Sequence, residues 1–302
     1  MSLLEKERED NMSSLYKKNK KFYLLLILPA LLLYSFAMLA PLFGGTIPYS
    51  FLKWNLMSGK KAFVGFDNYV KLFSDAKFWT SFGFNLFVGA FTIIGSNVFG
   101  FILAYFLNEN IKAKGVVRAM FFIPNIVSAV LVSFIWVFIF TNAMPALGGA
   151  LGWDWLANIS WFGTPSMATV TVSIWQNIGF LMIIYTAGLQ TIPKDVMESA
   201  ELDGCSGLKK VLKIELPLLM PTVTINLFVS ISGAFKSFDI PNAMTGGGPY
   251  GSTMPVAMNI YQEAFNKYNL GYGSAKSVIL FLTVAAVTLI QLYCTRKKEV
   301  EY

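Results

Sequence analysis

Long apolar runs separated by short polar stretches dominate the chain from residue 22 to residue 295. A bilayer core of about 30 Å needs about 20 apolar residues in a helix that rises about 1.5 Å per residue. None of the long runs contains an internal Asp, Glu, Lys or Arg, whereas a soluble helix normally has a polar face. The pattern predicts an all-α, polytopic membrane protein with six transmembrane helices: Phe22–Pro48, Phe82–Leu107, Ala119–Thr141, Met167–Leu189, Leu218–Phe235 and Ser277–Thr295.

The first apolar run also follows a basic stretch, as the core of a signal peptide would. Its apolar part extends from Phe22 to Ala40 and exceeds the 7 to 15 residues of a typical signal core. We therefore interpret residues 1–21 as an N-terminal segment, residues 22–295 as one transmembrane domain and residues 296–302 as a tail.

The distribution of charged residues predicts how the chain is oriented in the membrane. Charged residues make up only 14% of the chain, well below the roughly 25% of ordinary soluble domains. Lys and Arg concentrate in residues 1–21, between the second and third runs, in residues 190–217 and in the tail. Because cytoplasmic loops are rich in Lys and Arg, both termini are predicted to be cytoplasmic, although several lysines between Lys53 and Lys77 run against this count.

The composition argues against catalysis by this chain. No histidine is present, so the commonest general base and the commonest metal ligand are missing, and we predict no catalytic residues and no metal site. The two cysteines, Cys205 and Cys294, are too few for a disulfide framework and are interpreted as free thiols. No phosphate loop of the form G-x-x-x-x-G-K-[ST] occurs, so we expect any ATP and Mg²⁺ to bind to another chain.

Residues 190–217 contain two helix-forming stretches separated by a glycine. Pro193 suits the first helical position, and Gly204 can adopt the left-handed conformation that ends a helix. Ser206 can then cap a second helix, which Pro217 closes where the chain re-enters the membrane. The pattern predicts a helix-glycine-helix elbow on the cytoplasmic face.

The spacing of residues within this elbow is specific. Glu198-Ser199-Ala200, three residues, Gly204, nine residues and then Ile214-Glu215-Leu216-Pro217 resemble the EAA loop, E-A-A-x3-G-x9-I-x-L-P, of binding-protein-dependent ABC importer permeases. Only Ser199 departs from that pattern. The resemblance implies the type I ABC importer permease fold, in which the first elbow helix docks into a cleft on an ATPase subunit. Taken singly, the acidic residues would fit a solvated helix face; taken together, the resemblance implies a coupling surface of Glu198, Ser199, Ala200, Asp203 and Gly204.

A second set of motifs indicates one branch of this family. The chain resembles the maltose-type carbohydrate-uptake branch, and especially the first of its two membrane subunits. The resemblance lies at Phe66-Asp67-Asn68-Tyr69, Ile192-Pro193, Phe238-Asp239, Thr245-Gly246-Gly247-Gly248-Pro249, Tyr261, Ala264-Phe265 and Gly271-Tyr272. A sugar needs a cavity near the bilayer midplane with aromatic faces, amides and hydroxyls. The resemblance implies a substrate path formed by Trp175, Asn177, Gly179, Ser230, Gly233 and Ser237. The same Ser and Gly residues would also suit close helix packing.

The resemblance implies a permease subunit that forms half of a translocation path for a sugar, with an oligosaccharide as the expected substrate. The implied partners are a second permease subunit, two ATPase subunits and an extracytoplasmic sugar-binding protein, all at a bacterial inner membrane. A glycerol-phosphate-type solute and a stand-alone secondary transporter are the alternatives. The span cores lack the ionisable groups that ion-coupled transporters use, and Lys236 and Asp239, three residues apart, predict a local ion pair.

Overall fold

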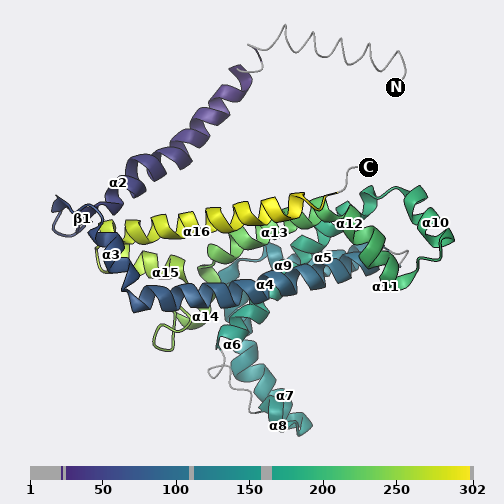
Figure 1. The fold of residues 1–302 in the computed structure, drawn as a ribbon. Coiled ribbons are helices and arrows are strands. Elements are labelled where there is room, and N and C mark those ends of the chain that lie inside the picture. The colour runs from purple at the N-terminus through teal and green to yellow at the C-terminus, as the bar shows by residue number, and fades with distance from the viewer. Residues whose placement is uncertain (1–21, 23–24, 109–111, 158–164, 300–302) are drawn as a thin grey trace.

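The computed structural model describes residues 22, 25–108, 112–157 and 165–299, and helices make up most of them (Figure 1). Here η marks short segments with wider, π-helical turns. The first helix, Leu25–Ser50, includes η1 (Ser35–Leu39), η2 (Leu42–Thr46) and α2 (Ile47–Ser50). The elements that follow are β1 (Leu52–Trp54), β2 (Lys61–Phe63), α3 (Asp67–Phe73), α4 (Ala76–Asn108), α5 (Lys114–Ile126), α6 (Ala129–Phe138), η3 (Ile139–Ala143), α7 (Met144–Leu151), α8 (Asp154–Ala157), α9 (Pro165–Thr191), α10 (Lys194–Leu202), α11 (Gly207–Lys210), η5 (Val211–Glu215), α12 (Leu216–Leu218), α13 (Met220–Phe235), α14 (Asp239–Thr245), α15 (Val256–Tyr261), η6 (Gln262–Asn266) and α16 (Leu270–Arg296).

The predicted spans are confirmed as helices, with two changes. Within the described residues, five helices are long and apolar enough to cross a membrane, and a sixth crossing arises if one bent pair counts as a single span. The bent pair is Gly207–Leu218 and Met220–Phe235, whose axes differ by 76°. The fifth predicted span therefore begins at a sharp bend beside Leu219. A small antiparallel hairpin of β1 and β2 is the one addition to the all-α expectation among the described residues.

The third predicted span, Ala119–Thr141, is wrong as a continuous helix. The helix α5 ends at Ile126, the next two residues are extended, and α6 begins at Ala129. Pro124 lies inside α5 and weakens the helix just before this break. The crossing segment is instead Ala129–Leu151, which comprises α6, η3 and α7.

A buried glutamine of α9 stabilises the break between α5 and α6. The Gln176 side-chain amide donates a hydrogen bond of 3.2 Å to the Val127 carbonyl, which the interrupted helix leaves without its usual partner. In return, the Asn125 amide lies 3.4 Å from the Gln176 backbone oxygen. These two contacts fix the broken helix against α9.

The bundle is built around the pair α4 and α9, which pack side by side over much of their length. Gly95 and Gly100 allow this approach, because an added Cβ would lie 2.4 Å from Ile174 and 3.2 Å from Leu181. The helix α13 packs against α4 and α16. In Figure 1 the first helix (purple) leans away from the bundle, and α6 to α8 project from its other side as an arm.

Candidate coupling elbow and translocation cavity

The elbow predicted from residues 190–217 is present at one end of the bundle (Figure 1). Gly204 has a φ of +72°, as predicted for a helix-ending glycine, and the Cys205 N–H donates a hydrogen bond to the Ala200 carbonyl. Pro193 is the cap residue before α10 and not its first helical residue. Ser206 precedes α11 as expected, but its side chain makes no capping hydrogen bond.

The residues of the predicted coupling surface do not all face outward. Glu198, Ser199, Asp203 and Gly204 are exposed, whereas Ala200 is buried. The methyl group of Ala200 therefore packs inside the elbow, where a larger side chain would not fit without rearrangement. The exposed surface available to a partner consists of the other four residues and of neighbouring apolar side chains such as Leu202.

An ion pair connects the two helices of the elbow. The Lys210 ammonium of α11 lies 2.6 Å from the Glu201 carboxylate of α10, and the Lys210 side chain is largely buried. The contact joins α10 to α11, the two helices that flank the left-handed turn at Gly204. The relative orientation of α10 and α11 is thus fixed by a backbone turn and by a charged contact.

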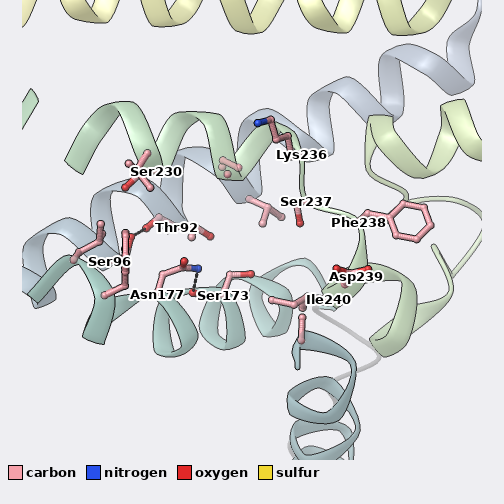
Figure 2. Close-up of a pocket in the computed structure, with 18 residues that line it drawn as sticks. Thr92, Ser96, Ser173, Asn177, Ser230, Lys236, Ser237, Phe238, Asp239 and Ile240 are labelled. Atoms are coloured by element: carbon pink, nitrogen blue, oxygen red, sulfur yellow. Dashed lines mark hydrogen bonds between the residues drawn. The ribbon is translucent and has the colours of Figure 1, made fainter. Parts of the chain in front are cut away.

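A cavity of about 250 Å³ lies where α4, α9 and α13 meet. Polar side chains from all three helices and from the segment that follows α13 line it: Thr92, Ser96, Ser173, Asn177, Ser230 and Ser237. Figure 2 shows the α4 and α9 side chains on one side of the cavity and those of α13 across from them. Phe180 of α9 and Phe238, which directly precedes α14, add aromatic residues to the lining. The charged Lys236 and Asp239 also line the cavity. Hydroxyls, one amide and aromatic rings in one cavity are suited to a hydroxyl-rich solute.

The structure divides the predicted path residues into two groups. Four of them line the cavity: Asn177, Ser230, Gly233 and Ser237. Trp175 does not line it, and its ring packs edge-to-face against Trp136 of α6 with centroids 5.6 Å apart. Gly179 does not line it either, because α5 approaches so closely that an added Cβ would lie 2.0 Å from the Phe121 carbonyl oxygen.

Among the cavity residues not predicted from the sequence are three with hydroxyl groups: Thr92, Ser96 and Ser173. Thr92 and Ser96 lie one helical turn apart in α4, and Ser173 lies one turn before Asn177 in α9. This spacing of small polar residues on one helical face was the available signal. The Thr92 hydroxyl is buried and has no hydrogen-bond partner among the described residues, so a bound solute or water would satisfy it.

The predicted ion pair between Lys236 and Asp239 is wrong. Both residues line the cavity, but no ion pair joins them among the contacts of the described residues. Figure 2 shows the Lys236 amine pointing away from Asp239. Lys236 follows the last residue of α13, Phe235, and Asp239 is the first residue of α14. The two residues therefore do not share one helix, and a separation of three residues does not place them on one face.

A polar network joins the three cavity helices beside the cavity. The Asn97 amide donates to the Ser230 hydroxyl at 3.1 Å, and the Tyr185 hydroxyl donates to the Asn97 side-chain oxygen at 2.9 Å. The Ser230 hydroxyl in turn donates to the Asn226 carbonyl. Polar contacts between helices in an apolar surrounding hold the helices in one arrangement.

A buried charge cluster holds together the end of the bundle opposite the elbow. The Lys276 ammonium of α16 lies 2.9 Å from the Asp75 carboxylate, 2.8 Å from the Asn259 side-chain oxygen and 3.5 Å from the Glu263 carboxylate. Burial by itself would raise the pKa of Asp75, but hydrogen bonds from Lys276 and from the Tyr272 hydroxyl outweigh it and lower the pKa to about 2. Both carboxylates remain charged at neutral pH and balance the buried ammonium.

Comparison with known proteins agrees with this geometry. A permease protein of Thermoanaerobacterium thermosulfurigenes, described as a probable starch degradation products transport system permease, is 36% identical over 285 residues, which are 94% of this chain and 97% of the relative. A multiple sugar-binding transport system permease of Streptococcus mutans is 35% identical over 86% of this chain and 90% of the relative. A trehalose/maltose transport system permease of Thermococcus litoralis is 31% identical over 94% and 97% of the two chains.

Solved structures support the fold. A chain from a bacterial ABC transporter involved in the import of the polysaccharide alginate matches with a TM-score of 0.78 at 18% identity, over 95% of this chain and 99% of that chain.

The family model for binding-protein-dependent transport system inner membrane components matches residues 96–300. This segment includes the elbow, the α9 and α13 walls of the cavity, and Ser96 of α4. The chain therefore belongs to the family of binding-protein-dependent transport system inner membrane components.

Proposed function

We propose that this chain is the permease subunit of an ATP-driven importer and forms half of a translocation path for a carbohydrate. The cavity between α4, α9 and α13 carries this proposal, because it combines hydroxyl, amide and aromatic groups at the junction of three spanning helices. The elbow lies at the end of the bundle where α9 finishes, and it supplies an exposed surface for an ATPase. The chain itself binds no cofactor in this proposal; ATP and Mg²⁺ bind to the ATPase subunits.

The proposed assembly contains a second permease subunit, two ATPase subunits and an extracytoplasmic sugar-binding protein in a bacterial inner membrane. Two features support a second membrane subunit. The most apolar stretch of the first helix buries none of its residues within this chain, and the Ala129–Leu151 arm buries only a small share. Both present apolar surface that another subunit and lipid would cover. In this arrangement the elbow and both termini face the cytoplasm.

The coupling role of the elbow is tested with Glu198→Arg and with Gly204→Val in the purified assembly. Gly204 has a positive φ that valine cannot adopt without strain, and Glu198 is an exposed charge of the proposed contact. We expect both variants to insert and assemble but to lose ATP hydrolysis stimulated by the sugar-loaded binding protein. Lys194→Glu, an exposed change in the same helix, is the control and should retain stimulation. Full stimulation in both elbow variants would refute the coupling role.

The cavity is tested with Asn177→Leu and Ser237→Ala, which remove polar groups from its walls. We expect a higher KM for transport of the sugar, with normal assembly and normal basal ATP hydrolysis. Trp175→Phe is the matched control, because Trp175 lies outside the cavity. A substrate panel of neutral sugars and glycerol phosphate identifies the solute class. Unchanged KM for every transported solute would exclude this cavity from the path.

A further inference from the structure

A row of large apolar side chains is exposed near the end of the bundle that lies opposite the elbow. It consists of Phe63 of β2, Phe66 just before α3, and Val70 and Phe73 of α3. Their exposed fractions are 78%, 71%, 70% and 65%. These residues lie outside the apolar helices that cross the membrane. Water would be an unfavourable environment for four large apolar side chains in one row. We call this row the α3 stripe.

The orientation of the α3 stripe is fixed by the opposite face of α3. The Asn68 amide donates hydrogen bonds to the Ser50 and Leu52 carbonyls at 2.8 and 3.0 Å. Leu72 is fully buried and packs against Phe78 and Tyr272 of the bundle. Positions 66, 70 and 73 are spaced by four and three residues and share the other face of the helix. Since α3 is attached on its polar and buried side, the stripe cannot turn inward.

The α3 stripe continues into the exposed face of a membrane-crossing helix. Phe73 stacks on Trp79 of α4 with ring centroids 6.3 Å apart, and the Trp79 indole nitrogen donates to the Phe73 carbonyl at 3.1 Å. From Trp79 the exposed apolar face of α4 runs on through Leu86, Phe87, Phe91, Ile94 and Val98. The two surfaces are therefore contiguous. A bilayer that covers the face of α4 would reach the α3 stripe at its edge.

The helix α3 lies beside the ends of spanning helices, which also agrees with a position at the boundary between headgroups and acyl chains. Asn68 binds the backbone at Ser50, where the first spanning helix ends, and α4 begins three residues after Phe73. Aromatic side chains are enriched at this level in membrane proteins, because their rings are stable between headgroups and acyl chains. An amphipathic helix can lie in this boundary with its apolar face toward the acyl chains.

We propose that the α3 stripe is an interfacial membrane anchor that inserts into the boundary between headgroups and acyl chains of the leaflet at this end of the bundle. It holds α3, and through Leu72 and Asn68 the connected ends of three spanning helices, at a fixed depth. The proposal depends on the membrane-spanning assignment of α4 but not on the identity of the solute or on coupling to ATP. Its test can therefore fail while the transport function stands.

The test uses the full chain reconstituted in phospholipid vesicles with an environment-sensitive fluorophore at single cysteines. Cys205→Ala and Cys294→Ala provide a cysteine-free background, and Phe66→Cys and Val70→Cys carry the probe. Ile94→Cys, on the exposed face of α4, is the lipid control. Met57→Cys, which is 73% exposed at the tip of the β1–β2 hairpin, is an equally exposed control outside the stripe. We expect lipids brominated near the headgroup end of the acyl chain to quench probes 66 and 70, and lipids brominated near the bilayer centre to quench probe 94, which lies near the middle of α4. Aqueous iodide should quench only probe 57.

Two results would overturn the proposal. One is iodide quenching of probes 66 and 70 as strong as that of probe 57. The other is protection from iodide that appears only when a sugar-binding protein or a second permease subunit is added, since the stripe would then be a protein-docking surface. A second measurement needs no substitution: a membrane-soluble photolabel should modify the tryptic peptide 62–71 of the unaltered protein and leave peptide 54–60 unmodified. Equal labelling of the two peptides would also contradict the proposal.

Discussion

Gly179→Ala should destabilise the protein strongly although it adds a single methyl group. The added carbon would lie 2.0 Å from the Phe121 carbonyl oxygen and 2.7 Å from the Phe122 Cα, whereas ordinary contacts begin near 3.4 Å. The helices α5 and α9 would have to separate by roughly 1.4 Å, which is the difference between an ordinary contact of 3.4 Å and the 2.0 Å to the Phe121 oxygen. Overpacking of this kind costs about 1 to 3 kcal/mol, and we expect about 3 kcal/mol because both neighbours are backbone atoms that no rotamer change can move.

The assay is the thermal unfolding of the purified assembly, followed by the loss of its size-exclusion peak. Gly233→Ala is the matched control, because an added Cβ at Gly233 meets nothing within 4 Å. We expect Gly233→Ala to keep the melting temperature and to raise the KM for solute, since Gly233 lines the cavity. Gly179→Ala should lower the melting temperature. Equal melting temperatures for Gly179→Ala and the wild type would refute the close contact between α5 and α9.

Three further predictions use the same melting assay. Lys276→Met leaves two carboxylates without their buried cation and should lower the free energy of unfolding by about 3 kcal/mol. Lys267→Met removes an exposed partner and should lower it by at most about 1 kcal/mol. Equal effects of the two substitutions would contradict the buried cluster. The pKa of Asp75 falls from 3.8 to about 2 on folding. The difference in free energy of unfolding between the wild type and Asp75→Asn should therefore be constant above about pH 4 and shrink as the pH falls toward 2. A constant difference down to pH 2 would contradict the lowered pKa of Asp75. Gln176→Leu removes the partner of the carbonyl at the helix break and should cost about 1 to 3 kcal/mol, whereas Gln190→Leu, at an exposed position of the same helix, should be neutral.

Hydropathy was sufficient to predict where the chain is apolar enough to cross a membrane, because a spanning helix must satisfy its own backbone. It did not predict the break at Val127, since residues on both sides are equally apolar. Pro124 and Asn125 were the local signals, but a proline inside a spanning helix is often tolerated. The break is stable because Gln176, about 50 positions later in the sequence, supplies the missing hydrogen bond.

Small residues gave an ambiguous signal in the spans, because glycine serves both cavities and close packing. Gly179 and Gly233 looked alike in the sequence, yet the first contacts α5 and the second lines the cavity. The side chains of Thr92 and Ser173 come from helices about 80 positions apart, and only the pairing of α4 with α9 brings them to one cavity. In the elbow, the left-handed conformation of Gly204 was predictable because glycine adopts it without steric cost. The burial of Ala200 depends on how α10 packs and was not predictable.

The most direct test of the proposed transport function is uptake of radiolabelled sugar into vesicles. The vesicles contain this chain with its second permease subunit and ATPase subunits, and the sugar is presented on the binding protein. We expect uptake that requires ATP hydrolysis and is lost in Glu198→Arg. Uptake by this chain alone, driven by an ion gradient and insensitive to ATP, would contradict the proposed function.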